Sequence, residues 1–390
     1  MAILGNVKRK VETIMATRGE SRSLFLESFL FAISIAYGGS VKLREALYKK
    51  GVLQSKRLPC PVVSIGNITV GGTGKTPMTV YVTELIRRFG YKVAIISRGY
   101  KGKAEKTGGV VCDGRMICME PDQAGDEPFM MAQRLKTVPV IVGKDRFKAG
   151  MLAVKKFNPD VVLLDDGFQH LRLYRDIDIV LLDYNSPFGN GHLLPRGILR
   201  EPASSLLRAD ALILTRSDSV PGSIKAKLLD RLMDLAQMRS VFLTFHAPYI
   251  YKVLKGAGDI ENSALSKSQA CDSEFLKGRK AFAFSGIARN EDFKHTVESF
   301  GCDVSGFAGF PDHHPYSDED INTILRSAKD AGAEIVCTTE KDYARMDHRK
   351  SWSIDLVIIG IEIAFGDDEA AFNAYIQNRL SVFERAVAAT

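Results

Sequence analysis

Apolar positions beyond residue 58 follow two periods along the chain. Short runs of valine, isoleucine and leucine are separated by stretches with helical spacing, such as Pro77 to Phe89 and Arg146 to Phe157. The runs, in order, are "PVVSI", "KVAIIS", "GGVVC", "VPVIVG", "DVVLLD", "IDIVLLD", "DALILTR", "VFLTF", "KAFAFSG", "EIVCTT" and "LVIIGIEI". Strands that alternate with helices predict an α/β fold with mostly parallel sheets covered on both faces.

So many strands exceed what one compact doubly wound domain usually carries, so the chain is predicted to form two α/β domains. Residues 1–175 form the first domain, together with an N-terminal helix, and residues 176–365 form a second, smaller one. A loop rich in proline and glycine, "NSPFGNGHLLPRG", follows the boundary near Arg175. The final helix, about 366–390, is a candidate to pack back on the first domain.

An apolar run near the N-terminus, "LFLESFLFAISIAY" (Leu24 to Tyr37), has two interpretations. It carries Glu27 and is shorter than the roughly 20 residues of a transmembrane helix, and it is not expected to be a cleavable signal peptide. Basic residues stand on both sides: Lys8, Arg9, Lys10, Arg18 and Arg22 before it, and Lys42, Arg44, Lys49, Lys50, Lys56 and Arg57 after it. This pattern fits a helix in the interface of an anionic membrane, but a helix packed on the core fits equally well.

Composition adds two limits. The net charge of +7 favours an anionic partner such as a nucleotide, a phospholipid or a nucleic acid, without choosing among them. Six cysteines are scattered with no C-x-x-C pair, which indicates reduced thiols in a cytosolic protein rather than disulfides or a zinc site.

The stretch "SIGNITVGGTGKTP", Ser64 to Pro77, resembles a phosphate-binding loop with one departure. The usual G-x-x-x-x-G-K-[ST] pattern has glycine where this chain has Thr69. The context is right, because a buried strand precedes the loop and an amphipathic helix follows it. We predict that Lys75 reaches the β- and γ-phosphates of a nucleotide and that Thr76 ligates Mg²⁺. The predicted nucleotide-binding residues are Thr69, Val70, Gly71, Gly72, Thr73, Gly74, Lys75 and Thr76; a plain glycine-rich turn is the alternative.

Two carboxylates follow the apolar residues in the stretch "PDVVLLDDGFQH" (residues 159–170). Asp165 and Asp166 lie at the carboxyl edge of a buried strand, where the Mg²⁺ of a bound nucleotide would sit. The alternative is a strand end followed by a turn at Gly167. Gln169 and His170 follow closely enough that either could face the γ-phosphate or the phosphoryl acceptor.

Further polar motifs complete a resemblance to a known family. In order along the chain, "GNITVGGTGKTP", "SRGY", "GDEP", "VGKDR", "LDDGFQH", "LLPRGILREP", "RADALILTR", "FPDHHPY" and "TTEKD" resemble the tetraacyldisaccharide 4'-kinases of lipid A biosynthesis. The resemblance runs from about residue 20 to beyond 345 and includes the unusual Gly-Gly ahead of Gly-Lys-Thr. It implies transfer of the ATP γ-phosphoryl group to the 4'-hydroxyl of an acylated glucosamine disaccharide 1-phosphate. It also implies Mg²⁺, the cytosolic face of the bacterial inner membrane, and no nucleic-acid partner.

Carried over residue by residue, the resemblance implies that Asp126 of "GDEP" pairs with a histidine of "FPDHHPY" to accept the proton of the acceptor hydroxyl. His313 is the histidine we assign, although the motif leaves His314 open. A helix N-cap at Asp126 and a loop role for the histidine are the alternatives. Glu127 is added to the Mg²⁺ ligands. The predicted substrate-binding residues are Arg98, Tyr100, Gln169, His170, Arg196 and Arg200, and the last two could instead make structural salt bridges.

A lipid acceptor favours the interfacial interpretation of Leu24 to Tyr37, because such a substrate does not readily leave the bilayer. Two other classes of protein remain as rivals. One is a nucleotide-driven switch or chaperone whose loop reads K-G-G-x-G-K-[ST], but Val70 stands where that lysine would be. The other is a nucleotide-binding scaffold without catalysis, which leaves "FPDHHPY" unexplained.

Overall fold

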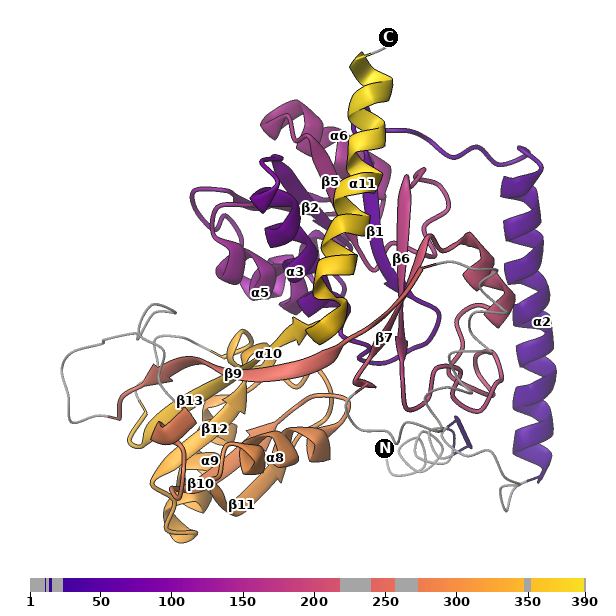
Figure 1. The fold of residues 1–390 in the computed structure, drawn as a ribbon. Helices are drawn as coiled ribbons and strands as arrows, with labels where there is room; N and C mark the ends of the chain where they lie inside the picture. The colour runs from indigo at the N-terminus through magenta and orange to yellow at the C-terminus, as the bar shows by residue number, and fades with distance from the viewer. Residues whose placement is uncertain are drawn as a thin grey trace.

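The structure, a computed structural model, describes residues 11, 14, 15, 24–217, 240–256, 273–346 and 352–388. It contains two sheets, with a long helix beside the first of them (Figure 1). The first sheet has the order β3-β4-β2-β5-β1-β6-β7-β8. Its strands are β1 (Val62–Asn67), β2 (Val93–Ser97), β3 (Gly109–Asp113), β4 (Pro139–Val142), β5 (Val161–Asp165), β6 (Ile177–Asp183), β7 (Ala211–Thr215) and β8 (Ser240–Leu243).

The first sheet is parallel except for β3, which runs antiparallel to β4. In β1, Val63 lies opposite Leu163 of β5 on one side and Ile177 of β6 on the other. Every residue of β1, β5, β6 and β7 is buried, which explains why these strands read as continuous apolar runs rather than alternating ones.

Helices cover both faces of the first sheet. On one face lie α3 (Lys75–Arg88), α5 (Asp126–Leu135) and α11 (Glu369–Ala388); on the other lie α6 (Arg146–Phe157) and the segment after β6. Three short elements, η1 (Lys103–Glu105), α4 (Pro121–Ala124) and η2 (Ala203–Arg208), lie in the connections. Phe372, Ile376 and Leu380 of α11 are buried in the same core as Val82 and Ile86 of α3. The final helix therefore returns to the first domain after the second domain is complete (Figure 1).

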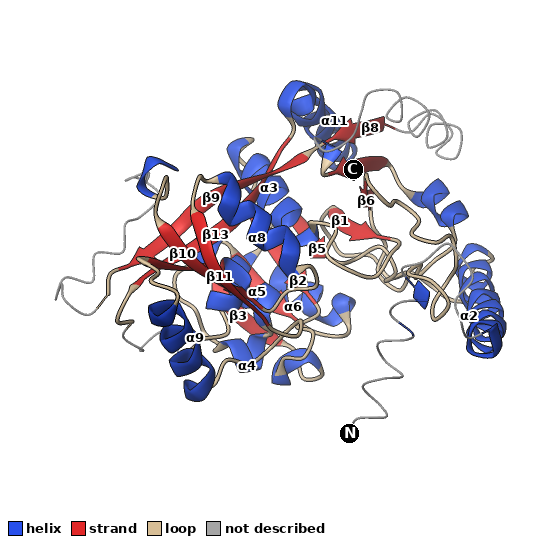
Figure 2. Ribbon diagram, turned by 90° about the horizontal axis from the view of Figure 1, so that it is seen from below, coloured by secondary structure: helices blue, strands red, loops and turns tan. Residues whose placement is uncertain are grey.

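The second sheet has the order β11-β10-β12-β13-β9, parallel except for β9 against β13. Its strands are β9 (Phe245–Leu254), β10 (Lys280–Ser285), β11 (Asp303–Gly309), β12 (Ile335–Thr339) and β13 (Asp355–Ala364). One face packs against α8 (Asn290–Ser299), and the other packs against α9 (Asp318–Asp330) and Tyr343 of α10 (Glu340–Tyr343) (Figure 2). The short elements η4 (Ser273–Phe275) and η5 (Gly366–Asp368) complete the described chain. The predicted α/β class, with a parallel P-loop domain and a smaller α/β domain, is confirmed.

The predicted domain boundary near Arg175 is wrong. Strands β6, β7 and β8 belong to the first sheet, because β6 pairs in parallel with β1 and the other two continue the ladder. The chain passes to the second sheet at Thr244, between β8 and β9, and returns through β13. The connection between β6 and β7 is largely irregular and rich in proline and glycine, and such a segment resembles a domain linker in sequence.

The N-terminal helix α2 (Leu24–Lys49) is longer than the apolar run from which it was predicted and lies along the outside of the first domain (Figure 1). Ser34 Oγ donates to Leu193 O at 2.9 Å, and Tyr37 Oη donates to Arg200 O at 2.8 Å. The basic residues Lys8, Arg9, Lys10, Arg18 and Arg22 lie outside the described part of the chain. One edge of α2 is therefore attached to the segment between β6 and β7.

Candidate active site

The loop between β1 and α3 has the geometry of a phosphate cradle. Gly71 and Gly74 have φ angles of 108° and 83°, in the region that favours glycine. Atoms placed as Cβ on Gly71 or Gly72 would meet nothing within 4 Å, so the loop faces open space there. A Cβ on Gly74 would lie 2.9 Å from Nε2 of His246, so a strand of the second domain closely approaches the start of α3.

The missing glycine at position 69 has a structural reason. Thr69 forms an extended bridge with Leu199, and Val70 N donates to Ile198 O at 2.8 Å, so the loop begins as paired, extended backbone. Asn67 Nδ2 donates to Thr73 Oγ1 at 3.0 Å and fixes the far side of the loop. The loop therefore needs no left-handed residue at position 69.

Lys75 and Thr76 begin α3, where backbone N–H groups and the helix dipole favour an anion. Lys75 Nζ lies 3.7 Å from Asp166 Oδ1, at the end of the neighbouring strand β5. Open glycines, a helix N-terminus and a lysine in one loop fit a nucleotide polyphosphate.

Three carboxylates lie beside this loop. Asp165 accepts from Thr79 Oγ1 at 3.2 Å and from Ser97 Oγ at 3.1 Å. Burial, reinforced by the charges of Glu127 and Asp166, raises the pKa of Asp165 to about 7. This surplus of negative charge is what a divalent cation would neutralise.

Asp166 has a different environment. Its carboxylate accepts from Arg200 Nη1 at 2.9 Å, and Arg200 and Lys75 together outweigh desolvation and hold the pKa of Asp166 below its usual range. Within the described ranges, no group of three or more histidine, cysteine, aspartate or glutamate side chains forms a complete metal site. Hydroxyl and carboxylate oxygens that leave coordination positions to phosphate fit Mg²⁺, with Thr76, Asp165, Asp166 and Glu127 as the residues that would hold it.

Asp126 and His313 meet across the gap between the two domains. Asp126 is the first residue of α5 in the first domain, and His313 follows β11 in the second. His313 Nδ1 lies 2.8 Å from Asp126 Oδ2, and Arg345 Nε donates to the same oxygen at 2.7 Å. Desolvation would raise the pKa of Asp126, but the bond to His313 and the charge of Arg345 outweigh it and lower that pKa.

Two questions left open by the sequence are the N-cap interpretation of Asp126 and the choice between His313 and His314. The N-cap of α5 is Gly125, and its first turn has no side-chain cap, so the N-cap interpretation of Asp126 is wrong. His314 turns away from Asp126, since its Nε2 lies 3.1 Å from Asp320 Oδ2 and its ring stacks on Phe310. His313 is therefore the histidine that contacts Asp126.

Three further predicted residues, Tyr100, Arg98 and Gln169, lie in the first domain. The exposed ring of Tyr100 lies edge-on to His313, with centroids 6.1 Å apart, and Arg98 pairs with Glu105 beside it. Gln169 Nε2 donates to Asn67 O at 2.8 Å, which supports the loop from below.

His170 is partly buried and follows the carboxylates Asp165 and Asp166 in the chain. Burial, followed by the charges of Arg146 and Arg175, lowers the pKa of His170 to about 4, so the ring is neutral at pH 7. Its Nε2 makes no hydrogen bond within the described residues.

Arg196 and Arg200 both contact helix α2. Arg196 is almost fully buried and forms an ion pair with Glu27 of α2, which gives it a structural salt bridge. Arg200 contacts α2 through its backbone oxygen and Asp166 through its guanidinium. Arg200 is thus placed between the helix and the carboxylates.

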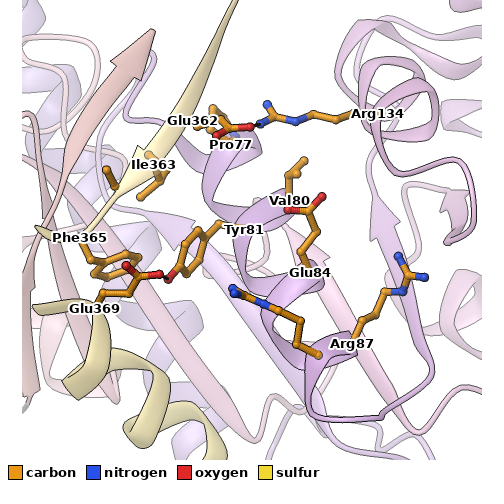
Figure 3. A pocket seen from close by; sticks show the side chains of 12 residues that line it. Pro77, Val80, Tyr81, Glu84, Arg87, Arg134, Glu362, Ile363, Phe365 and Glu369 are labelled. Carbon is orange, nitrogen blue, oxygen red and sulfur yellow. Dashed lines mark hydrogen bonds and ion pairs between the residues drawn. The ribbon is translucent and has the colours of Figure 1, made fainter. Parts of the chain in front are cut away.

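A hollow of about 700 Å³ lies beside α3 and is not lined by the phosphate loop or by Asp126, Asp165 or Asp166 (Figure 3). Its walls come from α3, α5, the end of β13 and the start of α11. In Figure 3 Arg134 points to Glu362, and Arg134 Nη2 donates to its Oε1 at 2.9 Å. This hollow therefore marks the return of the chain from the second domain, not the predicted site.

Comparison with known proteins then decides the family. The family model for tetraacyldisaccharide-1-P 4'-kinases, LpxK, matches residues 26–381. The chain belongs to the tetraacyldisaccharide 4'-kinase family. Tetraacyldisaccharide 4'-kinases of Desulfatibacillum aliphaticivorans and Syntrophus aciditrophicus are 38% and 39% identical, over 98% and 87% of this chain and 100% and 89% of theirs.

A solved member of the tetraacyldisaccharide 4'-kinase family has the same architecture. LpxK from Aquifex aeolicus, crystallised in complex with ATP, has a TM-score of 0.69 and 32% identity, over 91% of this chain and 100% of that one. Membership of this kinase family means that ATP, accompanied by Mg²⁺, is the phosphoryl donor.

Proposed function

We propose that this chain transfers the γ-phosphoryl group of ATP to the 4'-hydroxyl of a tetraacylated glucosamine disaccharide 1-phosphate in lipid A biosynthesis. The observation that carries the proposal is the Asp126–His313 pair, assembled from both domains beside the phosphate loop. The hydroxyl oxygen forms a bond to the γ-phosphorus, the bond to the bridging oxygen breaks, and ADP leaves. Mg²⁺ bound beside the loop would neutralise phosphate charge.

The pair accepts the hydroxyl proton. Asp126 Oδ2 already accepts from Arg345 Nε and faces Nδ1 of His313, and its second oxygen, Oδ1, accepts no other hydrogen bond within the described residues. The carboxylate is ionised at neutral pH because its pKa is lowered, so Oδ1 can take the proton as the new bond forms. His313 holds the carboxylate in place and shares the charge.

The acceptor sugar is proposed to lie between Tyr100 and His170. Tyr100 is exposed beside His313, and Nε2 of His170 makes no hydrogen bond within the described residues. Arg98, Gln169 and Arg200 are proposed to orient the substrate. Arg196 is better explained by its bond to Glu27.

Helix α2 is proposed to bind the cytoplasmic face of the inner membrane. By length and composition alone, Phe25–Lys49 could cross a membrane. A spanning helix, however, would draw the polar segment bonded to Glu27, Ser34 and Tyr37 into hydrocarbon. Its exposed apolar side chains are Phe25, Phe29, Phe31, Ile33, Ile35 and Leu43, and of these the ring of Phe31 also lies edge-on to His192 of that segment, with centroids 5.6 Å apart. In an interfacial position, the exposed apolar side chains of α2 would contact lipid while its polar contacts with the segment between β6 and β7 stay outside the hydrocarbon.

Replacing Phe25, Phe29 and Phe31 by serine should greatly weaken membrane binding. Each buried phenylalanine stabilises an apolar contact by roughly 1.5–3 kcal/mol. Sedimentation with vesicles of anionic phospholipid measures the loss, and calorimetry with an ATP analogue should show unchanged affinity. The matched control replaces two exposed apolar residues elsewhere, Met116 and Val382, by serine and should bind vesicles normally. Undiminished binding of the triple variant would mean that α2 is not the anchor.

The activity is tested with purified protein, labelled ATP and the acylated disaccharide 1-phosphate, with and without Mg²⁺. Labelled lipid should form only when Mg²⁺ and the acceptor are both present. ATP turnover that is independent of the acceptor would instead support the nucleotide-driven switch.

A further inference from the structure

A segment of the second domain, Glu340 to Arg345, makes three charge pairs with α5 of the first domain. Glu340 pairs with Arg134 at 3.8 Å, Lys341 with Glu127 at 3.5 Å, and Arg345 with Asp126 at 2.7 Å. Figure 1 shows α10 at the junction of the two domains. The pairs at the two ends of α5 are formed by side chains that are mostly buried, with Arg134 and Arg345 only 6% and 4% exposed.

Arg345 is held in place by its own domain. Its Nη1 donates to Gly286 O at 2.9 Å and to Asp342 Oδ1 at 3.1 Å. Asp342 is fully buried and also accepts from Thr339, from Gly286 N and from Tyr316. The guanidinium is thus oriented by the second domain, and its Nε is directed at a carboxylate of the first.

Arg345 contacts both members of the proposed pair. Nε donates to Asp126 Oδ2, and Nη2 lies 3.3 Å from His313 Nδ1. A planar guanidinium with fixed donors can set the rotation of a carboxylate, which a flexible ammonium cannot do as well.

We propose that Arg345 is a positioning residue for the Asp126–His313 pair. It fixes Oδ2 of Asp126 when the domains meet, and it leaves Oδ1 directed at the acceptor hydroxyl. This inference rests on the proposed function of the pair. It adds to it that the proton acceptor is complete only when the second domain supplies both His313 and Arg345.

The contacts give the inference a measurable signature. The charged and titratable groups around Asp126 are His313 and Arg345 in contact, with Glu127, Lys341, Asp312, Asp342 and Tyr100 beyond them. Loss of the guanidinium leaves Asp126 and His313 in the protein but removes the donor that fixes Oδ2 of Asp126. Turnover should therefore fall while the KM for ATP stays near the wild-type value.

The experiment compares Arg345→Gln, Arg345→Lys and the control Arg134→Gln in the full-length protein. Arg345→Gln should lower kcat by about 10²-fold, as for a misplaced catalytic group, while the KM for ATP stays near the wild-type value. Arg345→Lys keeps the positive charge but loses the planar guanidinium, so its kcat should also fall at an unchanged KM for ATP. Arg134→Gln removes an arginine from the same set of pairs and should keep kcat near the wild-type value.

Thermal unfolding and the affinity for an ATP analogue are measured for each variant. If Arg345→Gln does not fold, Arg345→Lys decides, and a wild-type kcat in that variant would overturn the inference. A wild-type kcat in a folded Arg345→Gln protein, or an equal fall in kcat in Arg134→Gln, would show a structural role only. Asp126→Asn distinguishes failure of the proposed pair from failure of the Arg345 inference. If Asp126→Asn is fully active, the proposed role of the pair is wrong, whatever the Arg345 variants do.

Discussion

Replacing Asp126 by alanine is expected to lower kcat by roughly 10²–10⁴-fold, the range for loss of a general base. Affinity for ATP should change little, because Asp126 contacts the second domain and not the phosphate loop. Steady-state kinetics with saturating lipid acceptor measures kcat, and calorimetry measures nucleotide binding. A wild-type kcat would transfer the base role to Asp165, Asp166 or His170.

The double variant Asp126→Ala, His313→Ala tests whether the two residues act as one unit. Its kcat should fall far less than the product of the two single losses, since residues that act together are not additive. The matched control is His314→Ala, which removes the neighbouring histidine that bonds Asp320, and its kcat should stay close to wild type. Strictly multiplicative losses would show two independent roles.

Replacing Lys75 by alanine is the second large effect, with an expected loss in kcat of roughly 10²–10³-fold. Lys75 begins α3 beside the loop, and its Nζ lies 3.7 Å from Asp166 Oδ1. Thr76→Ala should act in the same direction by removing a Mg²⁺ ligand.

Folding should survive Lys75→Ala, because Asp166 keeps its bond to Arg200. Unfolding temperature measures this directly. Lys103→Ala, at an exposed ion pair with Asp122 in the same domain, is the control and should retain activity. Normal turnover by a folded Lys75→Ala protein would remove the phosphate-loop assignment.

Local motifs were enough to predict the part of the candidate site whose residues are close in sequence. The loop from Thr69 to Thr76 and the carboxylates after β5 follow from a strand, a turn and a helix start, which are all local. The pairing of Asp126 with His313 depended on the family resemblance, since 187 positions separate them.

Other features could not be read from the sequence. Arg345 lies just beyond the motif "TTEKD" and gave no signal of its own, because a charged residue near a helix end is usually solvated. The boundary near Arg175 failed because an apolar run has the same appearance in either sheet. The parallel pairing of β6 with β1 places β6 in the first sheet.

The return of α11 to the first domain sets an order for synthesis on the ribosome. The chain emerges from its N-terminal end, so all eight strands of the first sheet and the whole second domain leave the tunnel before Phe372, Ile376 and Leu380 do. Until then, the apolar face beside Val82 and Ile86 lacks its cover. The first domain is therefore the first to begin folding and the last to finish, and a nascent chain stalled near Ala364 would carry an exposed hydrophobic surface that invites chaperones or aggregation.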